Sequence, residues 1–229
     1  PLFDGRTLVP EGHVVMSGGK IAELGPGRPG LQCAAFQDVQ GRLMAPGFVD
    51  LHSDALEKCI ELRPGAHFDH LFALEGLDRR LAAAGVTSFC HAVAFLDTPM
   101  GLRSPDSAAC MVSSVQAFAA STRSTIRHGV HIRFEVGSRE AAMTIQKLLH
   151  TRPPDLFSIM DHSPGQGQFK TMESFLHYYA NTYAISLARA EQIGRERTHQ
   201  SSRAWEDSFE LLETVRTFDI PILSHDDDT

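Results

Sequence analysis

Acidic and imidazole side chains alternate at the end of an apolar segment that follows the Pro46-Gly47 turn. They are Asp50, His52 and Asp54. Alternate residues of a β-strand point to the same face, so these three side chains would lie together on one face of a strand. Imidazole and carboxylate groups in place of core residues either carry a large burial cost or serve as metal ligands. The pattern favours a metal site at the end of this strand.

Polar side chains of the same types recur where later apolar segments end. Four of the five segments finish in histidine or carboxylate groups, and the residues concerned are His52, Asp54, His131, Arg133, Glu135, Asp161, His162, His225 and Asp227. A single buried histidine is usually a hydrogen-bonded core residue, whereas four segment ends of this kind are hard to explain by packing. Nitrogen and oxygen ligands suit Zn, Mn, Fe or Mg in a hydrolytic site. We therefore expect a hydrolase that binds one or two divalent metal ions.

Four basic residues lie near the same segment ends, namely Lys58, Arg63, Arg133 and Lys170. Cations of this kind bind phosphate oxygens, and arginine does so with bidentate geometry. The loop 162–170, which is rich in Gly and Gln, adds backbone amides that could cradle an anion. These features favour a phosphorylated substrate, and the alternative is a turn with ordinary surface charge.

The chemistry-bearing residues need a scaffold that brings the segment ends together. We predict strands over 48–52, 86–95, 131–136, 156–161 and 220–224. We predict helices over 71–84, 106–126, 140–150, 172–197 and 204–217, with Ser138 as the N-cap of the third. This alternation is typical of βα units, and five of them predict an incomplete (β/α)8 TIM barrel, whose active site lies at the carboxyl ends of its strands. An open doubly wound sheet is the alternative, but the chain has no GxGxxG or GxxxxGK[ST] motif.

The first 45 residues have a different character, with short apolar runs and many turns. Runs at 13–16 and 21–25 flank Gly18 and Gly19, which predicts a β-hairpin. We therefore divide the chain into a small β region over 1–45 and the barrel units over 46–229.

The composition of the chain limits the kinds of molecule that it is expected to bind. The net charge of -7 and the absence of a Lys/Arg block argue against nucleic acid. No apolar run is long enough to cross a bilayer, no signal peptide is evident, and the four cysteines are far apart, so we expect a cytoplasmic protein without a membrane partner. The sequence leaves a homo-oligomer open.

Six further histidines are expected to have structural or solvent-exposed positions. His91 lies inside a predicted strand, and a structural position is favoured for it over a role in the site. Histidines in turns or helices are expected at the surface, and these are His13, His128, His150, His177 and His199.

Several motifs together resemble a known family. The segments 18–25 and 46–52 resemble the amidohydrolase superfamily, which joins a small β-sandwich to a metal-bearing barrel. The segments 52–58, 132–135, 160–166 and 224–227 resemble its phosphonate-metabolism branch, which belongs to the carbon-phosphorus lyase pathway. The resemblance implies that residues 1–45 are part of the β-sandwich. It also implies that the chain holds the first five of eight barrel units.

The resemblance implies an activity on an acid anhydride. The substrate would be the 5-triphosphate of α-D-ribose 1-methylphosphonate, a small phosphorylated sugar phosphonate, cleaved to the 5-monophosphate and pyrophosphate. The implied metal ligands are His52, Asp54, Glu135, His162 and His225, with Asp161 or Asp227 as a catalytic, supporting or substitute group. Lys58, Arg133 and Lys170 would stabilise the phosphate chain.

Two other functions are compatible with the same residues. One is a deacetylase or deaminase that uses the same metal chemistry on carbon, and the other is a non-catalytic degenerate barrel that acts as a binding protein. The chain starts without Met, and the general base of the branch is expected beyond Thr229. We therefore expect a truncated barrel, in which exposed sheet edges leave the chain poorly stable and inactive when it is alone.

Overall fold

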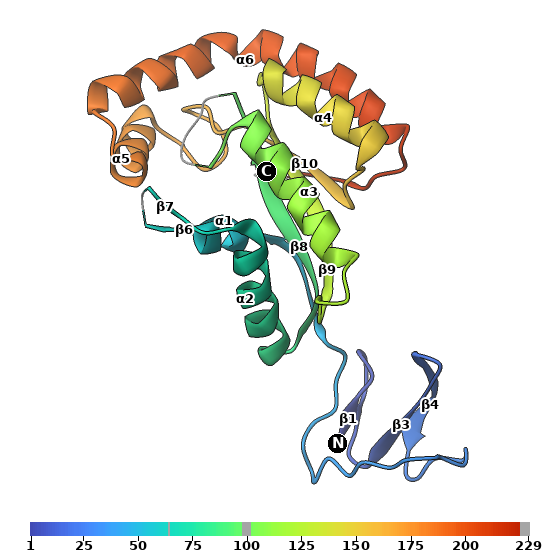
Figure 1. The fold of residues 1–229 in the computed structure, drawn as a ribbon. Coiled ribbons are helices and arrows are strands. Elements are labelled where there is room, and N and C mark those ends of the chain that lie inside the picture. The colour runs from blue at the N-terminus through green and yellow to red at the C-terminus, as the bar shows by residue number, and fades with distance from the viewer. Residues whose placement is uncertain (64, 98–101, 225–229) are drawn as a thin grey trace. The chain divides into compact units, whose positions relative to one another are not determined.

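The structure is a computed structural model that describes residues 1–63, 65–97 and 102–224. The chain forms two compact units, Pro1–Phe48 and Val49–Thr229, and Figure 1 shows their elements. Each unit is described by itself.

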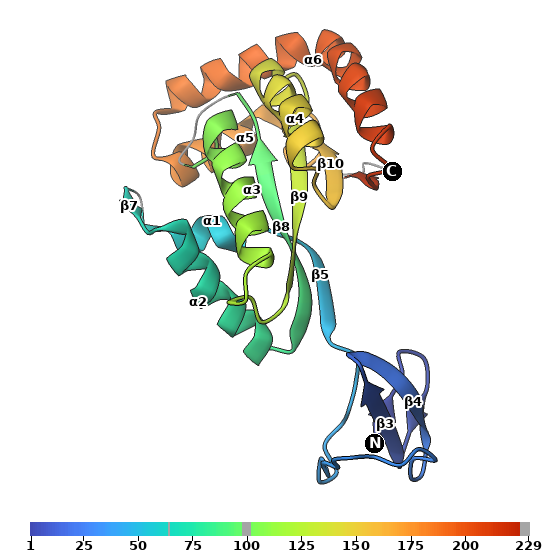
Figure 2. The same cartoon turned by 45° about the vertical axis from the view of Figure 1, so that its right-hand side comes forward.

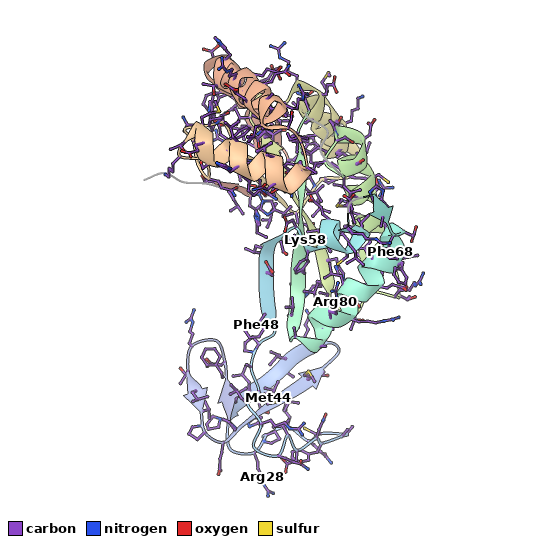
Figure 3. All side chains as sticks on the ribbon, turned by 90° about the vertical axis from the view of Figure 1, so that its left-hand side faces the viewer. Arg28, Met44, Phe48, Lys58, Phe68 and Arg80 are labelled. Carbon is purple, nitrogen blue, oxygen red and sulfur yellow. The ribbon has the colours of Figure 1, made fainter. Side chains whose placement is uncertain are left out.

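The smaller unit contains short antiparallel strands. They are β1 (Leu2–Phe3), β2 (Leu8–Val9), β3 (Gly12–Ser17) and β4 (Lys20–Pro26). β1 pairs with β2, and β3 pairs with β4. The predicted hairpin is confirmed, because Gly18 and Gly19 form its turn with φ of 58° and 75°, values that glycine adopts without strain. Met44 (Figure 3) bridges to Leu2 of β1. That these strands are part of a β-sandwich stays a prediction.

The larger unit is built on a five-stranded sheet with the order β11-β10-β9-β8-β5. Its strands are β5 (Phe48–Ser53), β8 (Val86–Phe95), β9 (Arg127–Glu135), β10 (Leu156–Met160) and β11 (Ile222–Ser224). The ladders β8·β9, β9·β10 and β10·β11 are parallel. A doubly wound sheet would reverse its strand order at a switch point, whereas here the order follows the chain. The predicted α/β class is confirmed, and the curled parallel sheet fits the predicted incomplete TIM barrel.

Most of the helices pack on one face of this sheet, whereas the helix 172–183 packs against the helix that follows it, and a small hairpin contacts the first helix. The helices are α1 (Ala55–Ile60), α2 (His70–Ala83), α3 (Pro105–Ala119), α4 (Arg139–Thr151), α5 (Met172–Tyr183) and α6 (Leu187–Arg216). The hairpin consists of β6 (Glu61–Arg63) and β7 (Ala66–His67). Figure 2 shows α3 and α4 side by side over the same face of the sheet. Within the described ranges, no helix is both long and apolar enough to span a membrane.

The predicted helix boundaries near the end of the chain are wrong. The break lies between α5 and α6, because Ala184 adopts a left-handed conformation with φ of 52° and ends α5. Ser186 then starts α6, where its side chain accepts a hydrogen bond from the backbone N–H of Arg189. No break occurs between 197 and 204, through which α6 runs continuously. The predicted helix over 106–126 likewise ends earlier, at Ala119.

The start of α4 differs in its details from the prediction. Ser138 occupies the N-cap position, but its side chain makes no capping hydrogen bond. Instead, the carboxylate of Asp97, which follows β8, accepts hydrogen bonds from the N–H groups of Glu140 and Ala141 at 3.1 and 2.8 Å. The hydroxyl of Ser138 in turn accepts from the N–H of Asp97. The end of β8 and the start of α4 are thereby joined.

The hydrophobic core lies between the sheet and these helices. The strand side chains Val93, Phe95, Ile132, Phe134 and Phe157 are fully or almost fully buried in it. In the parallel ladders, Val93 is opposite Ile132 and Phe134 is opposite Ile159, so this face is apolar along its length. The alternating residues of the same strands point to the other face, which is the inside of the curl.

Candidate functional site at the carboxyl ends of the strands

Polar residues line the inner face of the sheet. Ala94, Arg133 and Ser158 are register partners, and so are Glu135 and Met160 one step further along. Because alternate residues share a face, His131, Arg133 and Glu135 lie in one row along β9. All three are buried, with relative exposures of 1%, 7% and 4%. Side chains of this polarity would be costly in a core, so the inner face is suited to binding or catalysis.

Glu135 and His162 form a close pair at the end of this row. One carboxylate oxygen of Glu135, Oε2, is 2.7 Å from Nδ1 of His162, and the other, Oε1, accepts from the backbone N–H of His162 at 2.9 Å. A carboxylate accepts hydrogen bonds, so Nδ1 of His162 carries a proton, and in the neutral ring the lone pair is on Nε2. This is the orientation that carboxylates impose on metal-binding or proton-transferring histidines.

Neighbouring groups stabilise the ionised form of Glu135. Burial alone would raise the pKa of this carboxyl group. The guanidinium of Arg197 and the hydrogen bonds from His162 act in the opposite direction, and the net effect is a pKa below the ordinary value. Glu135 is therefore a buried anion with fixed partners.

Arg197 is a member of the site that the sequence did not reveal. It reaches from α6, with one terminal nitrogen 3.3 Å from Oε1 of Glu135 and 3.5 Å from the carbonyl oxygen of His162. Its guanidinium lies over the rings of Tyr179 and Phe175, at 5.4 and 6.0 Å from their centroids. The sequence around 197 does not distinguish Arg197 from the other charged residues of the helix. The aromatic residues of α5 that contact its guanidinium are a weak signal of a buried partner.

A second charged cluster includes Asp54 and three residues that were also missed. The guanidinium of Arg103 donates to Glu57 at 2.8 Å, to Asp54 at 3.4 Å and to the hydroxyl of Tyr183 at 3.4 Å. Burial raises the pKa of Glu57, and the nearby charge of Arg103 offsets this only in part. Asp54 thus lies at the end of β5, as expected, but it is paired with a cation.

His52 and His131 are in contact on the inner side of the sheet. Their ring centroids are 5.0 Å apart in an edge-to-face arrangement. His131 donates from Nδ1 to the carbonyl of Leu51 at 2.8 Å, so its Nε2 accepts from the hydroxyl of Ser158 at 2.8 Å. Burial lowers the pKa of His131. His131 is therefore a neutral hydrogen-bonding bridge beside the more exposed His52.

Asp161 lies in the loop after β10 and is fixed by two donors. Its carboxylate accepts from the N–H of Ser163 at 3.0 Å and from the indole N–H of Trp205 at 3.2 Å. A cleft of about 440 Å³ adjoins it. The residues that line the cleft are Ile159, Asp161, Gln166, Gly167, Trp205, Ile222, Leu223 and Ser224.

Among the predicted phosphate-binding residues, only Arg133 is buried on the inner face. Lys58 lies on α1 (Figure 3) and is exposed, as are Arg63 on β6 and Lys170 in the loop before α5. Arg103 and Arg197 supply the further cations near the inner face.

The structure leaves the predicted metal set incomplete. His225 and Asp227 lie outside the described residues. In the part of the chain that is described, no group of three or more His, Cys, Asp or Glu side chains could hold a metal ion. The donor types suit a divalent metal, and His162 has the right orientation, but Asp54 is engaged by Arg103. The metal roles of His52, Asp54, Glu135 and His162 remain predictions.

A buried chain of polar groups lies elsewhere, on the helix-covered face. The expectation that His128 is at the surface is wrong, because β9 begins at Arg127 and places the side chain of His128 at 0% exposure. Its Nε2 donates to Asp78 at 3.0 Å, and its Nδ1 accepts from Nε2 of His91 at 2.8 Å. His91 therefore belongs to this buried chain and not to the inner face.

The fold and the inner face together define an α/β half-barrel with buried charged groups at the carboxyl ends of its strands. No protein-family model matches the chain, and no solved structure matches it. Among curated proteins, it is similar to a hydrolase. That protein is the α-D-ribose 1-methylphosphonate 5-triphosphate diphosphatase of Escherichia coli (strain K12), with 29% identity over 193 residues.

The matched region covers 84% of this chain and 51% of the relative. The chain therefore spans about half the length of the curated protein it matches. The resemblance to the phosphonate-metabolism branch, which we inferred from the motifs, is confirmed by this similarity.

Proposed function

We propose that this chain is part of a hydrolase of phosphonate catabolism. The observation that carries the proposal is its similarity, over 84% of its length, to a protein named as a ribose methylphosphonate triphosphate diphosphatase. The reaction that we propose is hydrolysis of the 5-triphosphate of α-D-ribose 1-methylphosphonate to the 5-monophosphate and pyrophosphate.

The charges near the inner face support a polyanionic substrate. Arg133 is buried on that face, and Arg103 and Arg197 are held nearby by carboxylates. Guanidinium groups bind phosphate oxygens through two parallel hydrogen bonds and keep their charge when buried. We assign Arg133 to the phosphate chain, with Lys58, Arg63 and Lys170 as outer cations.

The orientation of His162 supports a role as a metal ligand or proton carrier. Together with His52, Asp54, Glu135 and His225 it forms the proposed ligand set, with Asp161 or Asp227 in support. A divalent metal bound there would supply a hydroxide nucleophile, and its positive charge would stabilise the leaving pyrophosphate. The residues of this chain would orient the imidazole through Glu135 and hold the triphosphate through arginine.

We also propose that residues 1–229 alone are inactive. In the described part of the chain, the sheet has edge strands at β5 and β11. Phe48, Val49 and Leu51 of β5 are at least 49% exposed. A rim made by only part of a barrel leaves a substrate open to water and its charges screened.

The test measures pyrophosphate release by ³¹P NMR from the triphosphate substrate, with Zn²⁺, Mn²⁺, Fe²⁺ or Mg²⁺ added in turn. It uses the protein as purified from its natural host and residues 1–229 produced alone. We expect release by the host protein, and a reduction of about 10- to 100-fold in kcat/KM for Arg133→Met, since a hydrogen bond to a charged group contributes about 1.5–3 kcal/mol.

Arg127→Met is the matched control, because Arg127 is exposed at the opposite end of the same strand. It should leave kcat/KM unchanged. Release of acetate or ammonia from amide or amine substrates without pyrophosphate release would replace the proposal by a deacetylase or deaminase. Turnover by residues 1–229 alone would refute the proposed inactivity.

A further inference from the structure

Glu135 is the centre of a compact hydrogen-bond network that joins three elements. Its carboxylate receives the backbone N–H and the ring Nδ1–H of His162, from the loop after β10, and the guanidinium of Arg197, from α6. Glu135 itself ends β9. The three groups come from distant parts of the chain, and Arg197 is 62 residues from Glu135.

The guanidinium of Arg197 is held from several sides. Its side chain is 12% exposed and lies over Tyr179 and Phe175 of α5. Tyr179 and Phe175 stack with their ring centroids 4.0 Å apart, and they belong to a hydrophobic cluster formed by α5, α6 and Phe169. The α5–α6 pair therefore presents Arg197 in a fixed position.

His162 needs such support because it lies two residues after Met160, the last residue of β10, and is not part of the sheet ladder. Its ring orientation depends on the carboxylate of Glu135. Arg197 contacts both this carboxylate and the main-chain carbonyl of His162, so it restrains the two partners together. One terminal nitrogen of the guanidinium makes both contacts, and the rings of Tyr179 and Phe175 hold that planar group in place. Lysine would keep the charge but not the planar group that lies over these rings.

We propose that Arg197 is a positioning residue of the site. It holds the Glu135 carboxylate and the His162 main chain, and thereby keeps His162 in the Nδ1–H tautomer with Nε2 directed away from Glu135. The assignment of this pair to a catalytic centre rests on the proposed function, but the positioning of His162 is a structural statement that is testable by itself.

The test observes the imidazole of His162 directly. Two-bond ¹H–¹⁵N spectra of the metal-free chain, recorded at about pH 9 so that imidazoles are neutral, distinguish the two histidine tautomers. We expect the Nδ1–H pattern in the unmodified protein and its loss in Arg197→Met. Arg197→Lys, which keeps a cation, should lose part of it.

Arg195→Met is the matched control on the same helix, because Arg195 is 72% exposed and pairs only with Glu191 among the described residues. It should leave the His162 spectrum unchanged. The indole N–H of Trp205, the single tryptophan, donates to Asp161 and reports whether the loop after β10 is intact. Its signal should be retained in the Arg197 variants.

An unchanged His162 spectrum in Arg197→Met would overturn the proposal. So would simultaneous loss of the Trp205 signal in both Arg197 variants, because Arg197 would then support the loop as a whole. In a Glu135→Gln background, Arg197→Met should have no further effect on the tautomer, and an undiminished effect would contradict a role through Glu135. These measurements use no substrate. A negative result would therefore count against the positioning role of Arg197 alone, whereas absence of pyrophosphate release would count against the proposed function.

Discussion

His91 makes the stability of the fold dependent on pH. Its side chain is 1% exposed, and its Nδ1 has no hydrogen-bond partner among the described residues. Burial, together with the nearby His128, lowers the pKa of His91 from 6.5 to about 3. The folded protein therefore keeps His91 neutral, while the unfolded chain takes up a proton as the pH falls through 6.5.

The sign and size of the effect follow from this difference. Stability from the neutral His91 is fully present above pH 6.5 and is lost as the pH falls from 6.5 towards 3. Each pH unit in this window costs about 1.4 kcal/mol. Between pH 7 and pH 5, we expect His91 to lower the free energy of unfolding by about 2 kcal/mol.

The assay is urea unfolding followed by far-UV circular dichroism at pH 7, 6 and 5. His91→Gln removes the titration, and its amide can still donate to Nδ1 of His128. This variant should lose about 2 kcal/mol less stability than the unmodified protein between pH 7 and pH 5. His177→Gln, at an exposed position of α5, is the control and should keep the original pH dependence. Equal losses in the His91→Gln variant and the unmodified protein would refute the reasoning.

Two further changes test local structure. Asp97→Ala removes the acceptor at the start of α4 and should lower the free energy of unfolding by about 1 kcal/mol in urea titrations; no measurable loss would show that the cap is unimportant. Gly137→Ala places a Cβ 2.8 Å from that of Ala204 at φ of 83°, so it should cost about 1–3 kcal/mol and lower the midpoint of thermal unfolding. Gly165→Ala, with φ of 92° but open space around the new Cβ, should cost less, and equal losses would show that the contact with Ala204 does not matter.

The sheet could be predicted from the sequence because its strands have clear patterns and boundaries. The strand over 86–95 is found with the same bounds, and the first strand differs by one residue. The division of α5 from α6 could not be predicted, since Ala184 ends the first helix without a Gly or Pro to mark the position. His128 was misplaced because the start of β9 was predicted at 131, although His128, Val130 and Ile132 alternate as strand residues do.

The site was only partly predictable for a related reason. A search of strand ends finds residues such as Glu135, the last residue of β9, and His162, which lies two residues after β10. It cannot find Arg197 or Arg103, which come from a long helix and from the segment before α3 and reach the site only through tertiary packing. The partners of such cations can be identified only when the fold is known.

The hydrogen bond between His131 and Leu51 has a consequence for how the curl forms. It joins residues 80 apart in the chain, so it can form only after β5, β8 and β9 have come together. The same imidazole is bonded to Ser158 of β10, and it therefore connects the first strand of the sheet to the third and fourth from within. One side chain on the inner face thus links strands that are not neighbours in the sheet, and the hydrogen exchange of the Leu51 region should follow that of β9 and β10.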